Sequence, residues 1–277
     1  MIHSDGRFKG ACNVCIAYQT WVPESQVKAA ILLVHGLGEH SGRYQNVVDR
    51  LVPLGYAIYA VDHIGHGKSE GLRKHVDVFT DFTDTLDIFY ERIKGWHGNN
   101  PIFLLGHSMG GLITAQYLLD HQDLFAGAVL SAPALKISDS IPQHKILMGK
   151  FLARFFPKVG ILPINPTKVS RDPKVVQAYM DDPLIHKGHS SAGLASELVK
   201  AMFRVKQGAN TIKLPVLILQ GTEDAIVNPA GAQEFYDGIV SVDKTLKLYP
   251  GLYHEVFNEP EKEHVFNDLE QWLIAHT

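Results

Sequence analysis

The stretch PIFLLGHSMGGLITAQYLLDH, residues 101–121, decides the fold of this 277-residue chain. It begins with an apolar run of strand length, passes through Gly106-His-Ser108-Met-Gly110, and continues over residues 112–121 with apolar residues at helical spacing. A strand, a sharp turn built on glycines and a helix, in this order, place a serine hydroxyl above the end of a parallel sheet. The pattern therefore predicts an α/β fold in which Ser108 is a candidate nucleophile.

Other short apolar runs along the chain have the length of buried strands. They are continuous rather than alternating, as expected for parallel strands that are covered on both faces. The runs are residues 30–35, 56–62, 101–107, 126–131 and 215–220. Helix-period stretches lie between and after them, for example at 79–93 and 261–276. This order predicts a mostly parallel central sheet flanked by helices, with ligands bound beyond the carboxyl ends of the strands.

The alternation of strand and helix patterns stops over residues 132–213. This segment has several prolines and no convincing central strand, so we expect an inserted, mainly helical cap on a catalytic core made of residues 1–131 and 214–277. The segment holds 13 Lys and Arg against 5 Asp and Glu, whereas the rest of the chain holds 13 against 24. The net charge of −3 therefore combines a basic cap with an acidic core.

Composition excludes several classes of protein. Apolar residues make up 45% and charged residues 20%, which argues against intrinsic disorder, and a net charge near zero argues against binding to nucleic acid. No apolar run reaches the roughly 18 residues that span a bilayer, and the first fifteen residues lack the pattern of a secretory signal. Two cysteines cannot build a disulfide framework, so we expect a cytoplasmic protein.

A second match to the serine pattern occurs at Gly67-Lys-Ser69-Glu-Gly71. No strand pattern directly precedes it, and Arg73 and Lys74 follow it. Ser69 is therefore interpreted as a loop serine in a turn, and Ser108 remains the candidate nucleophile.

A serine nucleophile needs a base, an acid that orients the base, and donors for the oxyanion. Asp224 follows the run at 215–220, and His254 follows a later strand pattern at 245–249, so both are expected at the carboxyl end of the sheet in the chain order Ser, Asp, His. Glu223 is the competing acid, and a surface loop histidine is the alternative for His254. The turn after residues 30–35 directs the Leu37 amide toward the same point as the Met109 amide, unless it is a plain tight turn.

With these residues in view, the chain resembles the monoacylglycerol lipases of the serine α/β-hydrolase superfamily. The matching segments are HGLGEHSGRY (35–44), DHIGHGKSEG (62–71), GHSMGG (106–111), QGTED (220–224) and YPGLYH (249–254). The resemblance implies an α/β-hydrolase fold, a triad of Ser108, Asp224 and His254, and oxyanion donors at Leu37 and Met109. It also implies that Glu39 and Arg43 orient the turn that follows residues 30–35 and carries Leu37, called the oxyanion loop below, or support a polar pocket for glycerol. A plain structural ion pair is the alternative.

Two departures from the family leave the substrate open. Phe257 stands where some members place a second histidine near the alcohol pocket, and the cap has only loose similarity. The expected activity is cleavage of the monoacylglycerol ester bond through an acyl-enzyme. A lysophospholipase or general carboxylesterase is the alternative, and a non-catalytic binding protein of this fold would need a degraded triad. We expect no metal, no organic cofactor and no protein partner, since the ligand-type residues Asp62, His63 and His66 lack further ligands at suitable spacing.

One stretch of the expected cap has the pattern of a basic amphipathic helix. Its apolar face contains Leu147, Met148, Phe151, Leu152, Phe155 and Phe156, and Lys150, Arg154 and Lys158 recur on the other face before and after Pro157. Such a helix can lie in a membrane interface, which would bring the enzyme into transient contact with lipid. The alternative is that the apolar face covers the active site and the basic residues are merely solvated.

Overall fold

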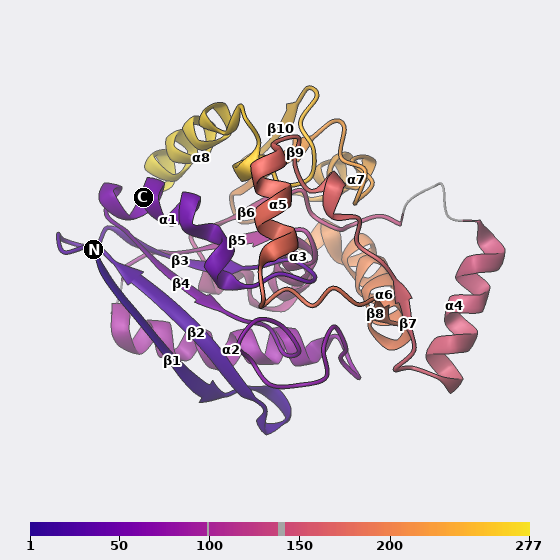
Figure 1. Ribbon diagram of the computed structural model, residues 1–277. Helices are drawn as coiled ribbons and strands as arrows, with labels where there is room; N and C mark the ends of the chain where they lie inside the picture. Colours follow the sequence, from indigo (N-terminus) through magenta and orange to yellow (C-terminus); the bar gives the residue numbers. More distant parts are fainter. Residues whose placement is uncertain (99, 138–141) are drawn as a thin grey trace.

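The computed structural model describes residues 1–98, 100–137 and 142–277, and an eight-stranded sheet forms its centre (Figure 1). The strand order is β1-β2-β4-β3-β5-β6-β9-β10. The six strands from β4 to β10 in this order are parallel, whereas β1 pairs with β2 and β2 with β4 in antiparallel fashion. The strands are β1 (Ile2–Lys9), β2 (Cys15–Val22), β3 (Ala29–Val34), β4 (Tyr56–Val61), β5 (Ile102–His107), β6 (Gly127–Ser131), β9 (Val216–Gly221) and β10 (Lys244–Tyr249).

The predicted parallel sheet is confirmed, and each of the five apolar runs is a strand whose ends lie within one residue of the prediction. Every residue of β3, β4, β5 and β6 is buried, which explains why these runs are apolar without alternation. The hairpin of β1 and β2 lies outside the predicted set. Its first strand is a largely exposed edge strand with a polar sequence, so it lacks the apolar pattern of the central strands.

Helices cover both faces of the sheet, and two apolar clusters mark the two layers. Buried side chains of α2 (Thr80–His97), α3 (Met109–His121), α6 (Ala192–Gly208) and α7 (Ala230–Gly238) share one cluster, and those of α1 (Gln45–Leu51) and α8 (Lys262–His276) share the other. Figure 1 shows α1 and α8 together on one side of the sheet and α2 on the opposite side. Short 3-10 helices connect the elements at Ala11–Asn13, Ser41–Tyr44, Val52–Leu54, Gln122–Leu124, Pro166–Lys168, Ala209–Thr211 and Val256–Asn258.

The segment between β6 and β9 is called the insert below, and its described residues contain three α-helices and a small antiparallel sheet. Its elements are α4 (Gln143–Phe155), β7 (Gly160–Leu162), α5 (Pro173–Asp181), β8 (Ser190–Ser191) and α6. Buried side chains of α6 such as Leu194 and Leu198 join the core cluster that also contains α3. In contrast, α4 has no buried residue and lies at the outer edge of the molecule (Figure 1). The division into a core and a cap at 132–213 stays a prediction, and residues 138–141 of it lie outside the described residues.

Close backbone contact between α3 and the sheet explains the glycines of the serine pattern. A Cβ atom on Gly110 would lie 2.0 Å from the carbonyl oxygen of Val34, at the end of β3. One on Gly106 would lie 2.3 Å from Oγ1 of Thr114 and 2.5 Å from the carbonyl oxygen of Gly110. Because neither position has room for a side chain, the glycines allow the first turn of α3 to rest on the strand ends.

We predict that Gly110→Ala lowers the free energy of unfolding by about 3 kcal/mol, because the backbone of β3 cannot move away from the added methyl group. Gly95→Ala is the matched control, since no atom lies within 4 Å of a Cβ at this position in α2. There alanine should stabilise the protein by about 0.5–1 kcal/mol through its higher helix propensity. Urea unfolding followed by circular dichroism measures both changes. Equal midpoints for Gly110→Ala and the unmodified protein would contradict the packing argument.

Candidate active site

Ser108 occupies a strained turn between β5 and α3. Its backbone has φ 55° and ψ −119°, a left-handed conformation that residues other than glycine rarely adopt. Two hydrogen bonds hold the turn: the Ser108 amide donates to the carbonyl of Ser131 (2.9 Å), and the Ala134 amide donates to the carbonyl of Ser108 (3.0 Å). Strain that the surrounding structure maintains in this way is common at functional sites.

Asp224 and His254 form a hydrogen-bonded pair at the ends of neighbouring strands. Because β9 and β10 are parallel and in register, the loops that follow them meet at the same edge of the sheet. The distance from Nδ1 of His254 to Oδ2 of Asp224 is 2.7 Å. The other carboxylate oxygen accepts the amides of Ile226 (2.9 Å) and Val227 (3.1 Å). Glu223, the competing acid, is exposed.

The pKa shifts of Asp224 and His254 are those expected of an orienting acid and its base. Burial alone would raise the pKa of the Asp224 carboxyl, but His254 and the two backbone amides outweigh it, so the pKa is lowered. Burial alone would lower the pKa of His254, but the charge of Asp224 outweighs it, so the pKa is raised. The imidazole is therefore a stronger base than a free one, and it becomes neutral only as the pH rises through this raised pKa.

The ring of His254 lies against the strand that carries Ser108. Its centroid is 4.8 Å from that of His107, the residue that directly precedes Ser108. Within the described part of the chain, no hydrogen bond joins the Ser108 hydroxyl to His254. The hydrogen bond between nucleophile and base is often longer in structures without substrate. The three predicted residues therefore lie in one site, and the bond from the Ser108 hydroxyl to His254 is the one that is not formed in the described part of the chain.

The loop after β3 lies directly beside Ser108. A Cβ atom on Gly36 would be 3.1 Å from Cβ of Ser108. The Leu37 amide is in this loop, and the Met109 amide is at the first position of α3. Across residues 1–98, 100–137 and 142–277, no protein acceptor receives a hydrogen bond from either amide. Two free amides beside a serine at a helix N-terminus are suited to bind an oxyanion.

His35 fixes the orientation of the peptide that carries the Leu37 amide. The His63 amide donates to Nε2 of His35 (2.9 Å), so the proton of this neutral ring is on Nδ1, which donates to the carbonyl of Gly36 (2.8 Å). In a trans peptide the carbonyl and the following amide point in opposite directions, so the Leu37 N–H is directed away from His35. On the other side of the loop, Oε1 of Glu39 accepts the Gly36 amide (2.5 Å).

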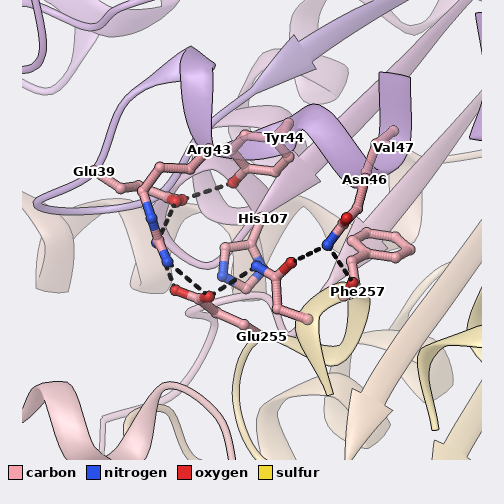
Figure 2. Close-up of a pocket in the computed structure, with 9 residues that line it drawn as sticks. Glu39, Arg43, Tyr44, Asn46, Val47, His107, Glu255 and Phe257 are labelled. Carbon is pink, nitrogen blue, oxygen red and sulfur yellow. Dashed lines mark hydrogen bonds and ion pairs between the residues drawn. The ribbon is translucent and has the colours of Figure 1, made fainter. Parts of the chain in front are cut away.

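Glu39 and Arg43 belong to a buried ionic cluster that also contains Glu255 (Figure 2). The Arg43 guanidinium donates twice to Glu255 (2.6 and 3.0 Å) and once to Glu39 (3.1 Å), and the hydroxyl of Tyr44 donates to Glu39 (2.6 Å). Burial alone would raise the pKa of Glu39, but His107, Arg43 and other neighbours lower it to about 2. The bond from the Gly36 amide supports the loop-orienting interpretation, and a role in glycerol binding stays a prediction.

Glu255 directly follows His254, but no pattern in the sequence predicts a role for it. Its role depends on Arg43, which is more than two hundred residues away in the chain, so no local pattern identifies it. The cluster lines a small cavity of about 10 Å³, the room of about one water molecule. Phe257 lines the same cavity and stacks on Phe266 with a ring distance of 5.3 Å, so this position offers a buried aromatic ring in place of a second histidine.

The remaining candidates are structural in this fold. The Ser69 hydroxyl donates to the carbonyl of Asp62 (2.5 Å) and accepts the Ala17 amide (2.8 Å), which agrees with its interpretation as a loop serine. Cys12 and Cys15 are free thiols. In the described ranges, no group of three or more His, Cys, Asp or Glu residues is arranged to hold a metal ion. None of the described helices is both long and apolar enough to cross a membrane.

We predict that His35→Phe lowers kcat for a soluble ester about 10–100-fold with little change in KM, because the Leu37 amide loses its fixed orientation. His35→Asn keeps a donor near the position of Nδ1 and should restore part of kcat. His97→Phe, a buried histidine at the end of α2, is the control and should leave kcat unchanged. Circular dichroism checks that each variant is folded. Equal losses in His35→Asn and His35→Phe would contradict the orienting role.

Comparison with known proteins agrees with the fold and the site. Residues 25–261 match the model of the Hydrolase_4 family, described as serine aminopeptidase S33. The chain is 36% identical to a monoacylglycerol lipase of Mycolicibacterium smegmatis (99% of this chain, 98% of that protein) and 34% identical to the human monoglyceride lipase (100% and 90%). The crystal structure of the Paleococcus ferrophilus monoacylglycerol lipase superposes with a TM-score of 0.84 at 34% identity, with each chain fully covered. The resemblance seen in the sequence is thereby confirmed, and the chain belongs to the serine aminopeptidase S33 family of α/β-hydrolases, together with the monoacylglycerol lipases.

Proposed function

We propose that the protein is a serine hydrolase that cleaves the ester bond of monoacylglycerols to a fatty acid and glycerol. The observation that carries this proposal is the 2.7 Å pair of His254 and Asp224 beside the strained turn at Ser108. The names of the full-length relatives support the substrate class.

In the first half-reaction, His254 takes the proton of the Ser108 hydroxyl as Oγ attacks the ester carbonyl. The carbonyl oxygen becomes an oxyanion that the Leu37 and Met109 amides bind. The intermediate then collapses: the bond from the carbonyl carbon to the glycerol oxygen breaks, and His254 gives its proton to that oxygen. Ser108 is left as an ester of the fatty acid.

In the second half-reaction, His254 takes a proton from water as the water oxygen attacks the acyl-enzyme. The same two amides bind the second oxyanion. The bond from carbon to Oγ then breaks, Oγ takes the proton from His254, and the fatty acid leaves. Asp224 keeps Nδ1 of His254 protonated and stabilises the imidazolium in both halves, since its own lowered pKa keeps it ionised.

The insert is suited to cover this site, and we propose that residues 132–213 act as its cap. Two contacts between α5 or the residue that ends it and the segment after β3 support this proposal: Nε2 of His40 donates to Asp182 (2.8 Å), and the Arg43 guanidinium lies 4.7 Å from the ring centre of Tyr179 in α5. The same triad would serve a lysophospholipase or a general carboxylesterase equally well. The preference for one substrate over another therefore depends on the insert that covers the triad.

We predict that a fluorophosphonate labels the unmodified protein and Ser69→Ala but not Ser108→Ala, because Ser108 has the proposed base and oxyanion donors, whereas the Ser69 hydroxyl is bonded to backbone groups. In a substrate panel, monoacylglycerols should be cleaved faster than diacylglycerols, triacylglycerols and lysophosphatidylcholine. Release of fatty acid measures the panel. Strong turnover of lysophosphatidylcholine with little turnover of monoacylglycerols would replace the proposed substrate, and labelling of Ser108→Ala would refute the proposed nucleophile.

Helix α4 supports a second part of the proposal, transient contact with an anionic membrane surface. Its apolar side chains are exposed, among them Leu147 (71%), Phe155 (63%) and Phe156 just beyond the helix end (55%), whereas the half-buried residues Ile146 and Leu152 are on a different side. The exposed basic residues Lys150 and Arg154 flank this apolar surface. Exposed apolar side chains bordered by cations are typical of helices that lie in a lipid interface.

We predict that the triple variant Leu147→Ser, Phe151→Ser and Phe155→Ser binds phosphatidylglycerol vesicles at least about tenfold more weakly than the unmodified protein, because it loses the apolar surface that enters the lipid. Ile274→Ser is the control, an exposed apolar residue on α8. Co-sedimentation with vesicles measures binding. Equal binding to phosphatidylcholine and phosphatidylglycerol vesicles would contradict the role of the basic residues.

A further inference from the structure

Lys74 is a buried cation beside the oxyanion loop, and neither the triad nor the proposed mechanism uses it. The residue is 2% exposed and has a left-handed backbone, with φ 51°. A methyl group placed on Gly38 would lie 3.1 Å from Nζ of Lys74 and 3.1 Å from Cδ1 of Ile164 in the insert. The ammonium therefore lies where the oxyanion loop meets the insert, against the residue that follows Leu37.

The ammonium has one hydrogen-bond acceptor and no carboxylate partner within the described residues. Nζ donates to the carbonyl of Gly188 (2.9 Å) in the insert. A buried charge with this little compensation is costly, so it is unusual unless it has a role. Burial lowers the pKa of Lys74 to about 8, and no acidic group offsets this effect.

The basic and histidine side chains around Lys74 do not compensate its charge. From its own loop, Arg73 binds the carbonyl of Gly67, and His66 is a neutral ring whose pKa burial lowers to about 3. From the insert, burial lowers the pKa of His186, and the charges of Lys74 and Arg73 lower it further. These groups supply no negative charge at the pH of an assay.

Three carboxylates of the surrounding elements are already paired. Asp62, at the start of the loop that carries Lys74, accepts the Ser41 amide (2.9 Å), the Ser41 hydroxyl (2.6 Å) and the Lys68 amide (2.8 Å). Asp182 of the insert accepts a hydrogen bond from His40 (2.8 Å) and one from the Leu184 amide (2.8 Å). Glu39 of the oxyanion loop accepts Arg43, Tyr44 and the Gly36 amide. The charge of Lys74 is therefore free to act on a negative charge that appears in the oxyanion hole.

We propose that the Lys74 ammonium is an electrostatic component of the oxyanion hole, which stabilises the tetrahedral oxyanion through space without touching it. The inference rests on the proposed function only as far as an oxyanion forms on the ester attacked by Ser108. Two unit charges separated by roughly 10 Å at an effective dielectric constant of about 20 attract each other enough for a rate effect of about tenfold. Because the charge is fixed before the reaction starts, it needs no reorganisation when the oxyanion forms.

A purely structural role is the competing explanation. The carbonyl of Lys74 accepts the Ser191 amide (3.1 Å), and Nζ binds Gly188, so the residue also ties its loop to the insert. The two roles differ in their dependence on pH. The ammonium is present below pH 8 and lost above it, so an electrostatic contribution to kcat disappears as the pH rises. The tether persists, because the backbone bond does not titrate and a neutral amine can still donate to Gly188.

The experiment measures kcat for a soluble aryl ester from pH 7 to 10 in the unmodified protein, Lys74→Met and Lys74→Arg. Lys68→Met is the matched control, an exposed lysine of the same loop that has no contact with the site. We expect Lys74→Met to be about tenfold slower at pH 7, and kcat of the unmodified protein to fall through pH 8 until the two agree. Lys74→Arg should stay fast to pH 10, since a guanidinium keeps its charge.

An alkyl boronic acid gives a second readout, because it forms an anionic tetrahedral adduct on the serine. Its affinity for the unmodified protein should exceed that for Lys74→Met about tenfold at pH 7, and the two affinities should agree at pH 9.5. The effect of His254 cancels in this ratio because both proteins share it. If the Met variant does not fold, the decline of boronic acid affinity through pH 8 in the unmodified protein and its absence in Lys74→Arg still test the proposal.

The free energy of unfolding, measured as a function of pH, distinguishes the charge of Lys74 from its role as a tether. An unfolded lysine has a higher pKa than folded Lys74, so the unfolded state binds more protons between pH 8 and 10.5, and the stability of the unmodified protein relative to Lys74→Met should rise over that range. A kcat ratio that stays constant with pH, or no difference between the two proteins, would overturn the proposal. Aryl ester turnover does not depend on the monoacylglycerol assignment, so failure of one proposal does not imply failure of the other.

Discussion

The contact between the first turn of α3 and the carboxyl end of β3 is the constraint on which the rest of the site depends. Gly110 allows the two backbones to meet, and the meeting forces Ser108 into its left-handed conformation. It also brings the loop after β3 against Ser108, where a Cβ atom on Gly36 would lie 3.1 Å from Cβ of Ser108. A side chain at position 110 would move both Ser108 and the loop after β3, the proposed nucleophile and the proposed oxyanion loop, because the same packing fixes both.

The distribution of charge has a structural meaning that the net value hides. Part of the positive charge of the insert forms ion pairs with the acidic core. Arg171 pairs with the buried carboxylate of Glu259 (2.5 Å) and with Glu261. Lys74, in contrast, is a cation of the core, and its ammonium donates to the carbonyl of Gly188 in the insert. On α4 the basic residues Lys150 and Arg154 border an exposed apolar surface instead. The positive charge of the insert therefore forms ion pairs with the core at Arg171 and borders an exposed apolar surface on α4.

The fifteen histidines divide by environment rather than by number. His35, His63, His66 and His107 are fully enclosed around the oxyanion loop, and burial lowers the pKa of each, so they act as neutral hydrogen-bonding rings. His254 is just as buried, yet its pKa is raised because the carboxylate of Asp224 faces it. The same side chain is therefore a structural element or a base according to whether a charged partner outweighs desolvation.

The sequence by itself determined the parallel sheet, the serine turn and the order of Ser108, Asp224 and His254, since apolar runs mark buried strands and parallel strands end at one edge. It also predicted a basic amphipathic helix at α4, and only the tertiary structure showed that its apolar side chains are exposed. Only the tertiary structure decided how the oxyanion loop is held: His35 by His63, Glu39 by Arg43 and Glu255, and Lys74 against Gly38. It also placed α6, an element of the insert, in the main core. These contacts join residues far apart in the chain, and the packing of loops, which no local periodicity encodes, selects them.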